Sequence, residues 1–571
     1  MSAKASPALM ATLTGLVPAR LVKKLDQNPS AAKAWTWDGL TVRTDTDETV
    51  TLAPEGGVVS AIEHVRCTCL LSPRCFHVLA VAAALELEGG EAPAEATAAD
   101  EPAPVVVETL TPTAGQRAVG VLALRVAEDL LRAGAAGAGA VLQSELLRLV
   151  HEARVEGAYR LSAAALRAVR GVRALRAEEP SFSTPELVAD LEDLLLSAHH
   201  LEGGGVVPAS VVGVARRTYL PRGHLRLTGL LCEPVIARGG YAGVTSWVVD
   251  EKGNLFTISD ILPAGPSRAR GAYDVAIALG DTSIPHRALC REGLFVQDAT
   301  ASDDLRLGAG KAVKAVRASG ATSWSDTGPG TRFREPFAAQ LARAFAALGV
   351  PEEQRARTAT ALFFEGTVIG HDGRALFVEV AGVGPLRLVS PDDHEELRYH
   401  ENLRQLARAA GKSIKVIGRL VPDARATVAA LAVSASPEIL PVPDALAQRV
   451  NLGLDVLQAA DVGGGRAVDL VTSFEVRALD PLHPLRRRVE RLAIHGVRSL
   501  PTEAGPVVDS ERAALERAML ERGSHVLGAL HGAALASTRG DPRLARAFLT
   551  GVVYERTATR SLRHATFVAR P

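Results

Sequence analysis

The stretch CTCLLSPRCFH, residues 67–77, holds three cysteines and a histidine within eleven positions. The candidate metal ligands in it are Cys67, Cys69, Cys75 and His77. Structural zinc sites use thiolate and imidazole ligands in a closed tetrahedron of four, so the stretch predicts zinc with no open position for a substrate. The alternative is a set of unligated residues, since cysteine is often buried as a small apolar side chain. Only two more cysteines occur in 571 residues, which favours the metal site.

The ligand spacing C-x-C-x5-C-x-H also predicts the local fold. Residues two apart in a strand point to the same side, so Cys67 and Cys69 can face one metal from a strand end. Residues two apart in a helix point in nearly opposite directions, so Cys75 and His77 cannot share a metal from within a regular helix. We therefore expect a helix to begin between them, after a turn at residues 72–73, in a small ββα finger.

The four candidate ligands match a known signature. Their spacing resembles the SWIM zinc finger, C-x-C-xn-C-x-H, at all four positions. Strand-like residues 40–43 and 49–52 and the apolar, helix-like residues 78–85 are similar to the ββα layout of that family. The resemblance covers only residues 40–88. It implies a bacterial SWIM-type protein whose finger binds zinc and contacts DNA or another protein.

The composition indicates a soluble protein of several domains. Hydrophobic residues make up 47% of the chain, and Lys plus Arg equals Asp plus Glu at 64 each, so the net charge is zero. A neutral chain does not coat nucleic acid over its whole surface, and any basic surface must be local. The sequence contains no apolar run long enough to span a membrane. Five cysteines make no disulfide framework, and we expect a cytoplasmic protein in which Cys232 and Cys290 are packed thiols.

Changes of pattern along the chain predict a multidomain α+β fold. The expected parts are a SWIM-type zinc-finger domain (1–90), a disordered Ala/Pro/Glu linker (91–112), a helical domain (113–205), a β-rich mixed domain (206–355), an OB-like barrel (356–440) and a helical C-terminal domain (441–571). The linker is too poor in apolar residues to form a core. The barrel rests on strand patterns around the Asp-Gly turn at 372–373, followed by a helix and two further strands.

Motifs of known active sites are incomplete in this chain. The stretch LGAGKAV at 307–313 lacks two features of a phosphate-binding loop, because Leu305 replaces the first glycine and Ala312 replaces Ser or Thr. The stretch HEELRYH at 394–400 has Arg398 where a zinc protease needs its second histidine. We therefore expect no enzyme and no small-molecule substrate. A site assembled from distant residues is the open alternative.

Local basic residues are the remaining candidates for contact with nucleic acid. Arginine can hold two phosphate oxygens at once with its planar guanidinium. The candidates are Lys23, Lys24, Arg66, Arg74, Arg486, Arg487 and Arg488. For the last three, a solvated helix face is the alternative. The sequence thus predicts a non-enzymatic zinc-finger binding protein with DNA as its first candidate partner, and a protein such as an ATPase as the alternative.

Overall fold

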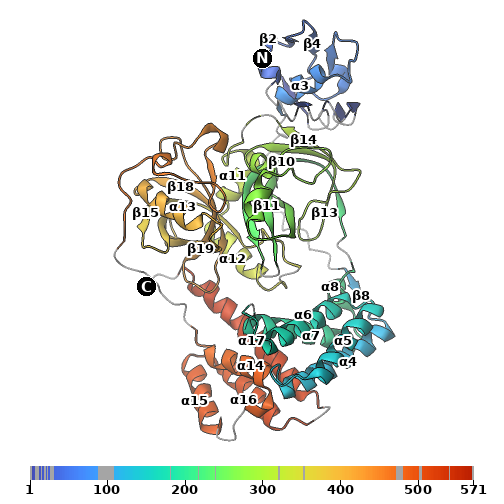
Figure 1. The fold of residues 1–571 in the computed structure, drawn as a ribbon, viewed down its shortest axis with the longest axis vertical. Helices are drawn as coiled ribbons and strands as arrows, with labels where there is room; N and C mark the ends of the chain where they lie inside the picture. Colours follow the sequence, from blue (N-terminus) through green and yellow to red (C-terminus); the bar gives the residue numbers. More distant parts are fainter. Residues whose placement is uncertain are drawn as a thin grey trace. The chain divides into compact units, whose positions relative to one another are not determined.

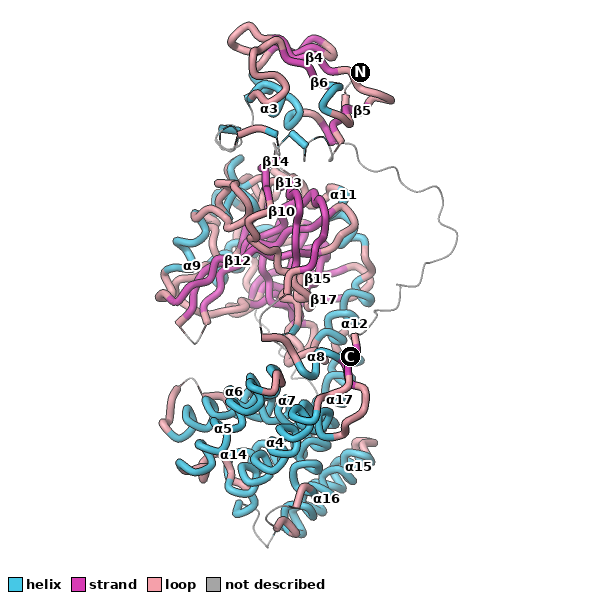
Figure 2. Tube along the Cα trace, turned by 90° about the vertical axis from the view of Figure 1, so that its right-hand side faces the viewer, coloured by secondary structure: helices cyan, strands magenta, loops and turns pink. Residues whose placement is uncertain are grey.

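Two structural units are built from segments that alternate along the chain. The first comprises Met1–Glu95, Thr218–Arg477 and Thr566–Pro571, and the second comprises Ala96–Arg217 and Ala478–Ala565. The computed structural model describes residues 3–6, 9, 12, 13, 16–18, 21, 24, 25, 31–87, 108–180, 182–215, 218–237, 240–318, 320, 322–351, 354–470, 480–499, 504–538 and 541–568. Strands dominate the first unit and helices the second, which makes a multidomain α+β protein (Figures 1 and 2).

A small antiparallel sheet carries the cysteine motif. Its strands, in pairing order, are β2 (Thr36–Asp38), β3 (Thr41–Arg43), β4 (Thr49–Leu52) and β6 (Val65–Cys67). Three short strands of the same module pair in parallel, in the order β5 (Val58–Val59), β1 (Lys4–Ala5) and β7 (Glu86–Leu87). Helix α3 (Phe76–Ala84) begins within the motif and buries residues 78–83. The strands at 41–43 and 49–52 and the helix are confirmed, and the module has more strands than the expected ββα finger.

Residues 220–318 form a five-stranded antiparallel sheet, which we call the first sheet. Its strands, in the order β12-β11-β10-β13-β14, are β12 (Leu255–Pro263), β11 (Tyr241–Asp250), β10 (Leu220–Ile236), β13 (Gly293–Ala301) and β14 (Lys314–Ala318). Arg306 bridges Thr257 of β12 in parallel, and its neighbour Leu307 bridges Ala301 of β13 in antiparallel fashion. The pairing therefore runs from β10 through β11, β12, residues 306–307 and β13 back to β10.

Residues 361–451 form a six-stranded sheet, which we call the second sheet. As in the first sheet, its first strand in the chain lies between the second and the fourth. Its strands, in the order β17-β16-β15-β18-β19-β20, are β17 (Gly384–Val389), β16 (Leu376–Val380), β15 (Ala361–His371), β18 (Ser413–Leu420), β19 (Thr427–Ser434) and β20 (Arg449–Asn451). Strand β17 also pairs in parallel with β19, so the pairing of β15, β16, β17, β19 and β18 returns to β15, and β20 pairs with β19 outside this circuit. Helix α13 (Tyr399–Leu406) lies between β17 and β18 in the chain.

The two sheets pack together through apolar side chains. Along β11 the side chains alternate: Val248 joins the interior cluster of the first sheet, whereas Trp247 and Val249 join a cluster shared with the second. The second sheet contributes Phe363 and Ile417 to this shared cluster. One face of each sheet is therefore covered by the other. Between the sheets in sequence lie α11 (Thr327–Arg334) and α12 (Phe337–Ala347).

Helices from both halves of the chain share one core in the second unit. They are α4 (Ala114–Ala133), α5 (Ala140–Val155), α6 (Tyr159–Arg176), α7 (Thr184–Glu202), α14 (His483–His495), α15 (Ala504–Arg517), α16 (Glu521–Leu535) and α17 (Arg543–Thr566). Leu130 and Leu194 belong to the same cluster of buried residues as Leu485 and Phe548. Buried Glu128 on α4 accepts a hydrogen bond from the Ala545 N–H (2.9 Å), which ties the two segments together.

The division of the chain into structural units differs in three places from the domain boundaries predicted from the sequence. The helices assigned to separate domains at 113–205 and 441–571 form a single unit. Strand β20 at Arg449–Asn451 lies in the second sheet, although it falls within the span assigned to C-terminal helices. Residues Thr109–Leu110 form β8, which pairs with β9 (Val207–Pro208), within the span assigned to the linker. Residues 88–107 of that span lie outside the described residues.

Polar residues interrupt the long helices. In the part of the chain that the structure describes, no helix is both long enough and apolar enough to cross a bilayer. Helix α17 illustrates the reason, because arginines and threonines recur along its 24 residues.

Candidate metal centre

The four ligand candidates lie at the junction of a strand and a helix. Cys67 is the last residue of β6, and Cys69 follows two positions later. Cys75 is the N-cap of α3, and His77 is the second residue of that helix. The predicted start of the helix between Cys75 and His77 is therefore confirmed. The chain turns before the helix at Ser72-Pro73, whose peptide bond is cis.

The side chains of these residues converge on one point. The three Sγ atoms and a ring nitrogen of the histidine all lie within 4.8 Å of one another. Cys67 Sγ lies 3.7 Å from His77 Nδ1. In a tetrahedral zinc site, bond lengths of about 2.3 Å to sulfur and 2.0–2.1 Å to nitrogen give an S···N edge of about 3.6 Å. The cluster thus has the donor set and the spacing to hold a metal ion.

Backbone N–H groups point at the sulfurs. The Cys69 N–H donates to Cys67 Sγ (3.5 Å), and the Val78 N–H donates to Cys75 Sγ (3.5 Å). Such donors favour the thiolate form that a metal requires. Burial has the opposite effect on the free thiols: it raises the pKa of Cys75 to about 12 and also raises the pKa of Cys67. Metal binding must therefore release protons from these thiols.

Aromatic side chains pack beside the histidine. The Trp35 ring meets the His77 ring edge-on at 5.8 Å and the Phe76 ring at 6.4 Å between centroids. Lys24 Nζ lies 4.5 Å above the Phe76 ring. Trp37 is 37% exposed and donates its Nε1–H to the Ala32 carbonyl (2.7 Å). Trp35 thus fixes the histidine ring, whereas part of Trp37 faces solvent.

The basic residues proposed near the finger differ in their surroundings. Lys23 lies outside the described residues. Lys24 is engaged above the Phe76 ring. Arg66 on β6 and Arg74 before α3 are exposed, and no side-chain hydrogen bond or ion pair joins either to another residue that the structure describes. Of the basic residues proposed near the finger, Arg66 and Arg74 are therefore the two for which the described part of the chain offers no side-chain partner.

The three arginines proposed in the C-terminal region belong to the second unit, where acidic side chains engage them. Arg486 pairs with Asp480 (2.6 Å) and with Glu555 (2.7 Å). Arg487 and Arg488 share Glu511, and Arg488 is buried. These contacts lie within the fold of the unit. The structure does not present Arg486, Arg487 and Arg488 as a row of free cations.

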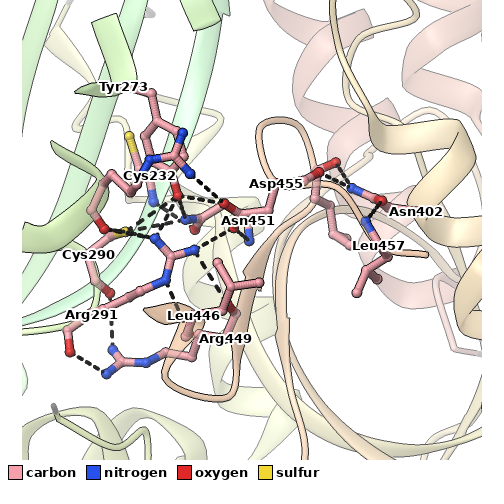
Figure 3. Close-up of polar contacts among 12 residues, drawn as sticks. Cys232, Tyr273, Cys290, Arg291, Asn402, Leu446, Arg449, Asn451, Asp455 and Leu457 are labelled. Carbon is pink, nitrogen blue, oxygen red and sulfur yellow. Dashed lines mark hydrogen bonds and ion pairs between the residues drawn. The ribbon is translucent and has the colours of Figure 1, made fainter. Parts of the chain in front are cut away.

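A buried polar network between the two large sheets has no counterpart among the sequence motifs. Asp455 accepts hydrogen bonds from Tyr273 Oη (3.0 Å) and from Arg291 Nη2 (2.6 Å) (Figure 3). Asn451 donates from Nδ2 to Tyr273 Oη (2.7 Å) and to Cys290 Sγ (3.3 Å). Each of these five residues is at most 3% exposed. Closed to solvent in this way, the network holds β20 and its flanks against the first sheet.

Arg449 extends this network. Its guanidinium donates to the carbonyl oxygens of Cys290 (3.1 Å) and Arg291 (2.8 Å) (Figure 3). It also donates to the Gly229 carbonyl (2.7 Å). Burial lowers the pKa of Arg449 to about 10, which still leaves the group charged at neutral pH. Backbone carbonyls thus solvate a buried cation, and each belongs to the chain of the first sheet.

A buried carboxylate provides a second polar link between the sheets. Glu233 on β10 accepts from Trp247 Nε1 (3.0 Å), from Arg419 Nη2 (2.6 Å) and from Arg357. Burial alone would raise the pKa of Glu233, but the Coulomb attraction of Arg357 and Arg419, with the hydrogen bonds from Arg357 and Trp247, outweighs burial and lowers the pKa. The residue remains ionised, and its charge is satisfied across the interface.

Cys232 and Cys290 are packed thiols, as the sequence predicts. Both are buried in one small cluster with Tyr273. Burial raises the pKa of Cys232 well above its usual value, so this thiol is protonated at neutral pH. A protonated, inaccessible thiol is a poor nucleophile.

A buried serine–histidine pair lies in the first sheet. Ser246 Oγ lies 2.8 Å from His286 Nδ1, and both residues are fully buried. His286 Nε2 has no hydrogen-bond partner among the described residues. Burial lowers the pKa of His286 to about 4, against the attraction of Asp260. The imidazole is therefore neutral at pH 7, and its burial keeps the pair from the solvent through which a substrate would arrive.

Comparisons with protein families, with curated proteins and with solved structures found no match for this chain. Its function must therefore be inferred from the geometry of its own residues.

Proposed function

We propose that this chain is a non-enzymatic binding protein whose N-terminal SWIM-type finger is shaped by zinc. The observation that carries the proposal is the convergence of Cys67, Cys69, Cys75 and His77 on one point. Four protein ligands complete a tetrahedron and leave no position for water or substrate, so the metal stabilises the module and performs no chemistry. Reduced thiols suit the cytoplasm, where we place the protein.

Zinc fits the donor set better than the other common metals. Soft thiolates favour zinc, copper(I) or iron–sulfur chemistry, whereas magnesium and calcium take oxygen ligands. One histidine beside three cysteines is a standard zinc set. Trp35 holds the His77 ring from the side, and the N–H groups of Cys69 and Val78 support the sulfurs. These supporting contacts are what a structural site requires.

We further propose that the two large sheets are tandem OB-like barrels that act as a scaffold. In the first sheet β10 pairs with β11 and β13, and β12 runs parallel to Arg306. In the second sheet β15 pairs with β16 and β18, and β17 runs parallel to β19. In the second sheet, α13 lies between the third and fourth strands, as in an OB fold. Residues 306–307 stand for the fifth strand of the first sheet. Trp247 is committed to the interface between the sheets, so it is not free to stack on a nucleic-acid base.

A protein is our first candidate partner, and DNA is the second. Strong DNA binding requires several phosphates to be neutralised. Arg486, Arg487 and Arg488 are paired with carboxylates instead. The observation that favours DNA is the pair of exposed cations, Arg66 and Arg74, beside the metal centre. Neither partner needs a catalytic group.

Metal analysis and titration with a DNA duplex test this function. The purified chain should carry one zinc per molecule by mass spectrometry of the metal content. In a mobility-shift assay, a DNA-binding protein would lose affinity steeply between 50 and 200 mM salt, because the release of counterions from DNA becomes less favourable as the salt concentration rises. We expect no salt-sensitive shift. A shift that weakens with salt and vanishes in Arg66→Ala/Arg74→Ala would reverse the ranking of the two partners.

A further inference from the structure

The loop between the second and third cysteines holds two leucines in solvent. Leu70 is fully exposed, and Leu71 is 64% exposed. Single apolar residues on a surface are common, but adjacent ones at a loop tip form a small apolar projection. Burying them would remove a large apolar area from water. The position between two metal ligands makes this projection part of the finger.

Hydrogen bonds order this loop from within. The Arg74 N–H donates to the Leu71 carbonyl (2.8 Å), and the Ser72 N–H donates to the Cys69 carbonyl (3.2 Å). The Cys67 N–H donates to Ser72 Oγ (3.2 Å). With metal ligands at both ends as well, the loop has little conformational freedom left to lose. Such preorganisation lowers the entropic cost of binding.

Cations flank the leucines. Arg66 and Arg74 are exposed and, among the described residues, have no side-chain partner. Residues 66–74 contain no acidic side chain. A surface that combines an apolar centre with guanidinium groups at its rim is complementary to an apolar pocket bordered by carboxylates.

We propose that Leu70, Leu71, Arg66 and Arg74, together called the tip, dock into an acid-rimmed apolar pocket of a partner protein. The proposal rests on the function proposed above and names the chemistry of the partner. A leucine wedge between DNA bases is the competing use of such a tip. We favour a protein because the two cations of the tip can neutralise only two phosphates, which is too few for strong duplex binding through this surface.

A peptide selection tests the tip. The zinc-loaded full chain is used to select binders from a phage-displayed library of random dodecapeptides, and their affinity is measured by fluorescence anisotropy. We expect sequences that combine large apolar residues with Asp or Glu. Leu70→Ser/Leu71→Ser should weaken binding at least tenfold, since burying one leucine is worth roughly tenfold in affinity. Arg66→Ala/Arg74→Ala should weaken binding less and remove most of its salt dependence.

Matched controls separate the tip from general surface effects. Val141→Ser and Leu535→Ser change exposed apolar residues on helices of the second unit and should leave peptide affinity unchanged. Each variant must retain its zinc content, which shows that the finger is folded. If a leucine variant loses zinc, the arginine variant provides the test.

The remaining outcomes overturn the proposal in distinguishable ways. Selected peptides that bind wild type and Leu70→Ser/Leu71→Ser equally would place the binding surface elsewhere and leave the proposed binding function intact. If no peptide is enriched and a 20-base-pair DNA duplex binds wild type but not Leu70→Ser/Leu71→Ser, the partner of the tip is DNA and not a protein. Absence of both peptide and duplex binding would count against the tip and the proposed function together.

Discussion

The metal centre and the buried network between the large sheets are both polar clusters, but the chain assembles them over very different distances. Cys67 and His77 are ten positions apart. Arg291 and Asp455 are 164 positions apart, and Arg449 reaches a carbonyl 220 positions away. The first cluster can form once a short loop closes, whereas the second forms only after two sheets have folded and met.

The two clusters also draw on different sources of stability. The metal centre gathers three thiols, and burial raises the pKa of two of them, Cys67 and Cys75, so it depends on a metal to convert these two to thiolates. The network contains its own opposite charges, Arg291 and Asp455, and its members Tyr273 and Cys290 pack in an apolar cluster with Val244 and Leu454. Removing the metal should therefore affect one region, and removing a charge should affect the other.

The largest expected effect is the loss of the metal centre. Cys75→Ser removes a buried ligand, and structural zinc contributes roughly 10–16 kcal/mol of apparent binding free energy in small fingers, more than a module of this size can replace. We expect no bound zinc, and loss of amide-hydrogen protection over residues 31–87 by exchange mass spectrometry. Residues 361–434 should keep their protection, because the core of the second sheet contains no metal ligand. Phe295 and Val316 of the first sheet share the apolar cluster of Cys75, so β13 and β14 should lose part of theirs.

Cys232→Ala is the matched control for that experiment. It removes an equally buried thiol that lies in the first sheet. Zinc content should stay at one per chain. A Cys75→Ser protein that still holds one zinc would exclude Cys75 as a ligand.

Sequence reasoning succeeded where the determining residues are neighbours in the chain. The spacing of the four ligand candidates predicts their geometry, because a strand and a helix allow few ways to bring Cys67, Cys69, Cys75 and His77 together. The start of α3 after Cys75 follows from the same constraint. Alternating residues predicted β3 and β4, and the Asp-Gly turn predicted the hairpin of β15 and β16.

Long-range partners gave no such signal. Nothing beside Arg449 in the sequence indicates that carbonyls of the first sheet will surround it. Arg486, Arg487 and Arg488 look like a basic patch until Asp480, Glu511 and Glu555 are seen beside them. The sequence did not predict that α4–α7 and α14–α17 share one core. Apolar helix faces pack together when their shapes fit, and the distance between them in the sequence gives no sign of this.

The second largest effect should come from breaking the buried ion pair. Asp455→Ala leaves the Arg291 guanidinium charged and enclosed, which costs about 3–5 kcal/mol of unfolding free energy. Chemical denaturation followed by tryptophan fluorescence reports this, because Trp247 lies in the apolar cluster shared by the sheets. Zinc content should not change.

An exposed pair supplies the control for that measurement. Glu251 pairs with Arg226 at the surface (3.0 Å), so Glu251→Ala should cost at most about 1 kcal/mol. Equal destabilisation by Asp455→Ala and Glu251→Ala would show that burial contributes nothing to the network.

Acid should weaken the first sheet through His286. Its folded pKa of about 4 lies below the usual value of 6.5, so the unfolded chain binds the proton first as the pH falls. The stabilisation is complete above pH 6.5 and is lost between pH 6.5 and 4, by about 3 kcal/mol. Denaturation at several pH values should show that slope in wild type and a smaller one in His286→Asn. The exposed His525→Asn should keep the wild-type slope.

The smallest expected effect tests whether a sulfur in the network matters. Cys290 Sγ lies 3.2 Å from the Arg287 carbonyl and accepts from Asn451 Nδ2, and both contacts are weaker than hydrogen bonds between oxygen and nitrogen. Cys290→Ser keeps a donor and acceptor in nearly the same volume, so denaturation should show a change within about 1 kcal/mol. Cys290→Ala leaves Asn451 without one acceptor and should cost about 1–3 kcal/mol. If the serine variant is as unstable as the alanine variant, the cysteine contributes through its apolar packing, and the hydrogen bond to Asn451 adds little.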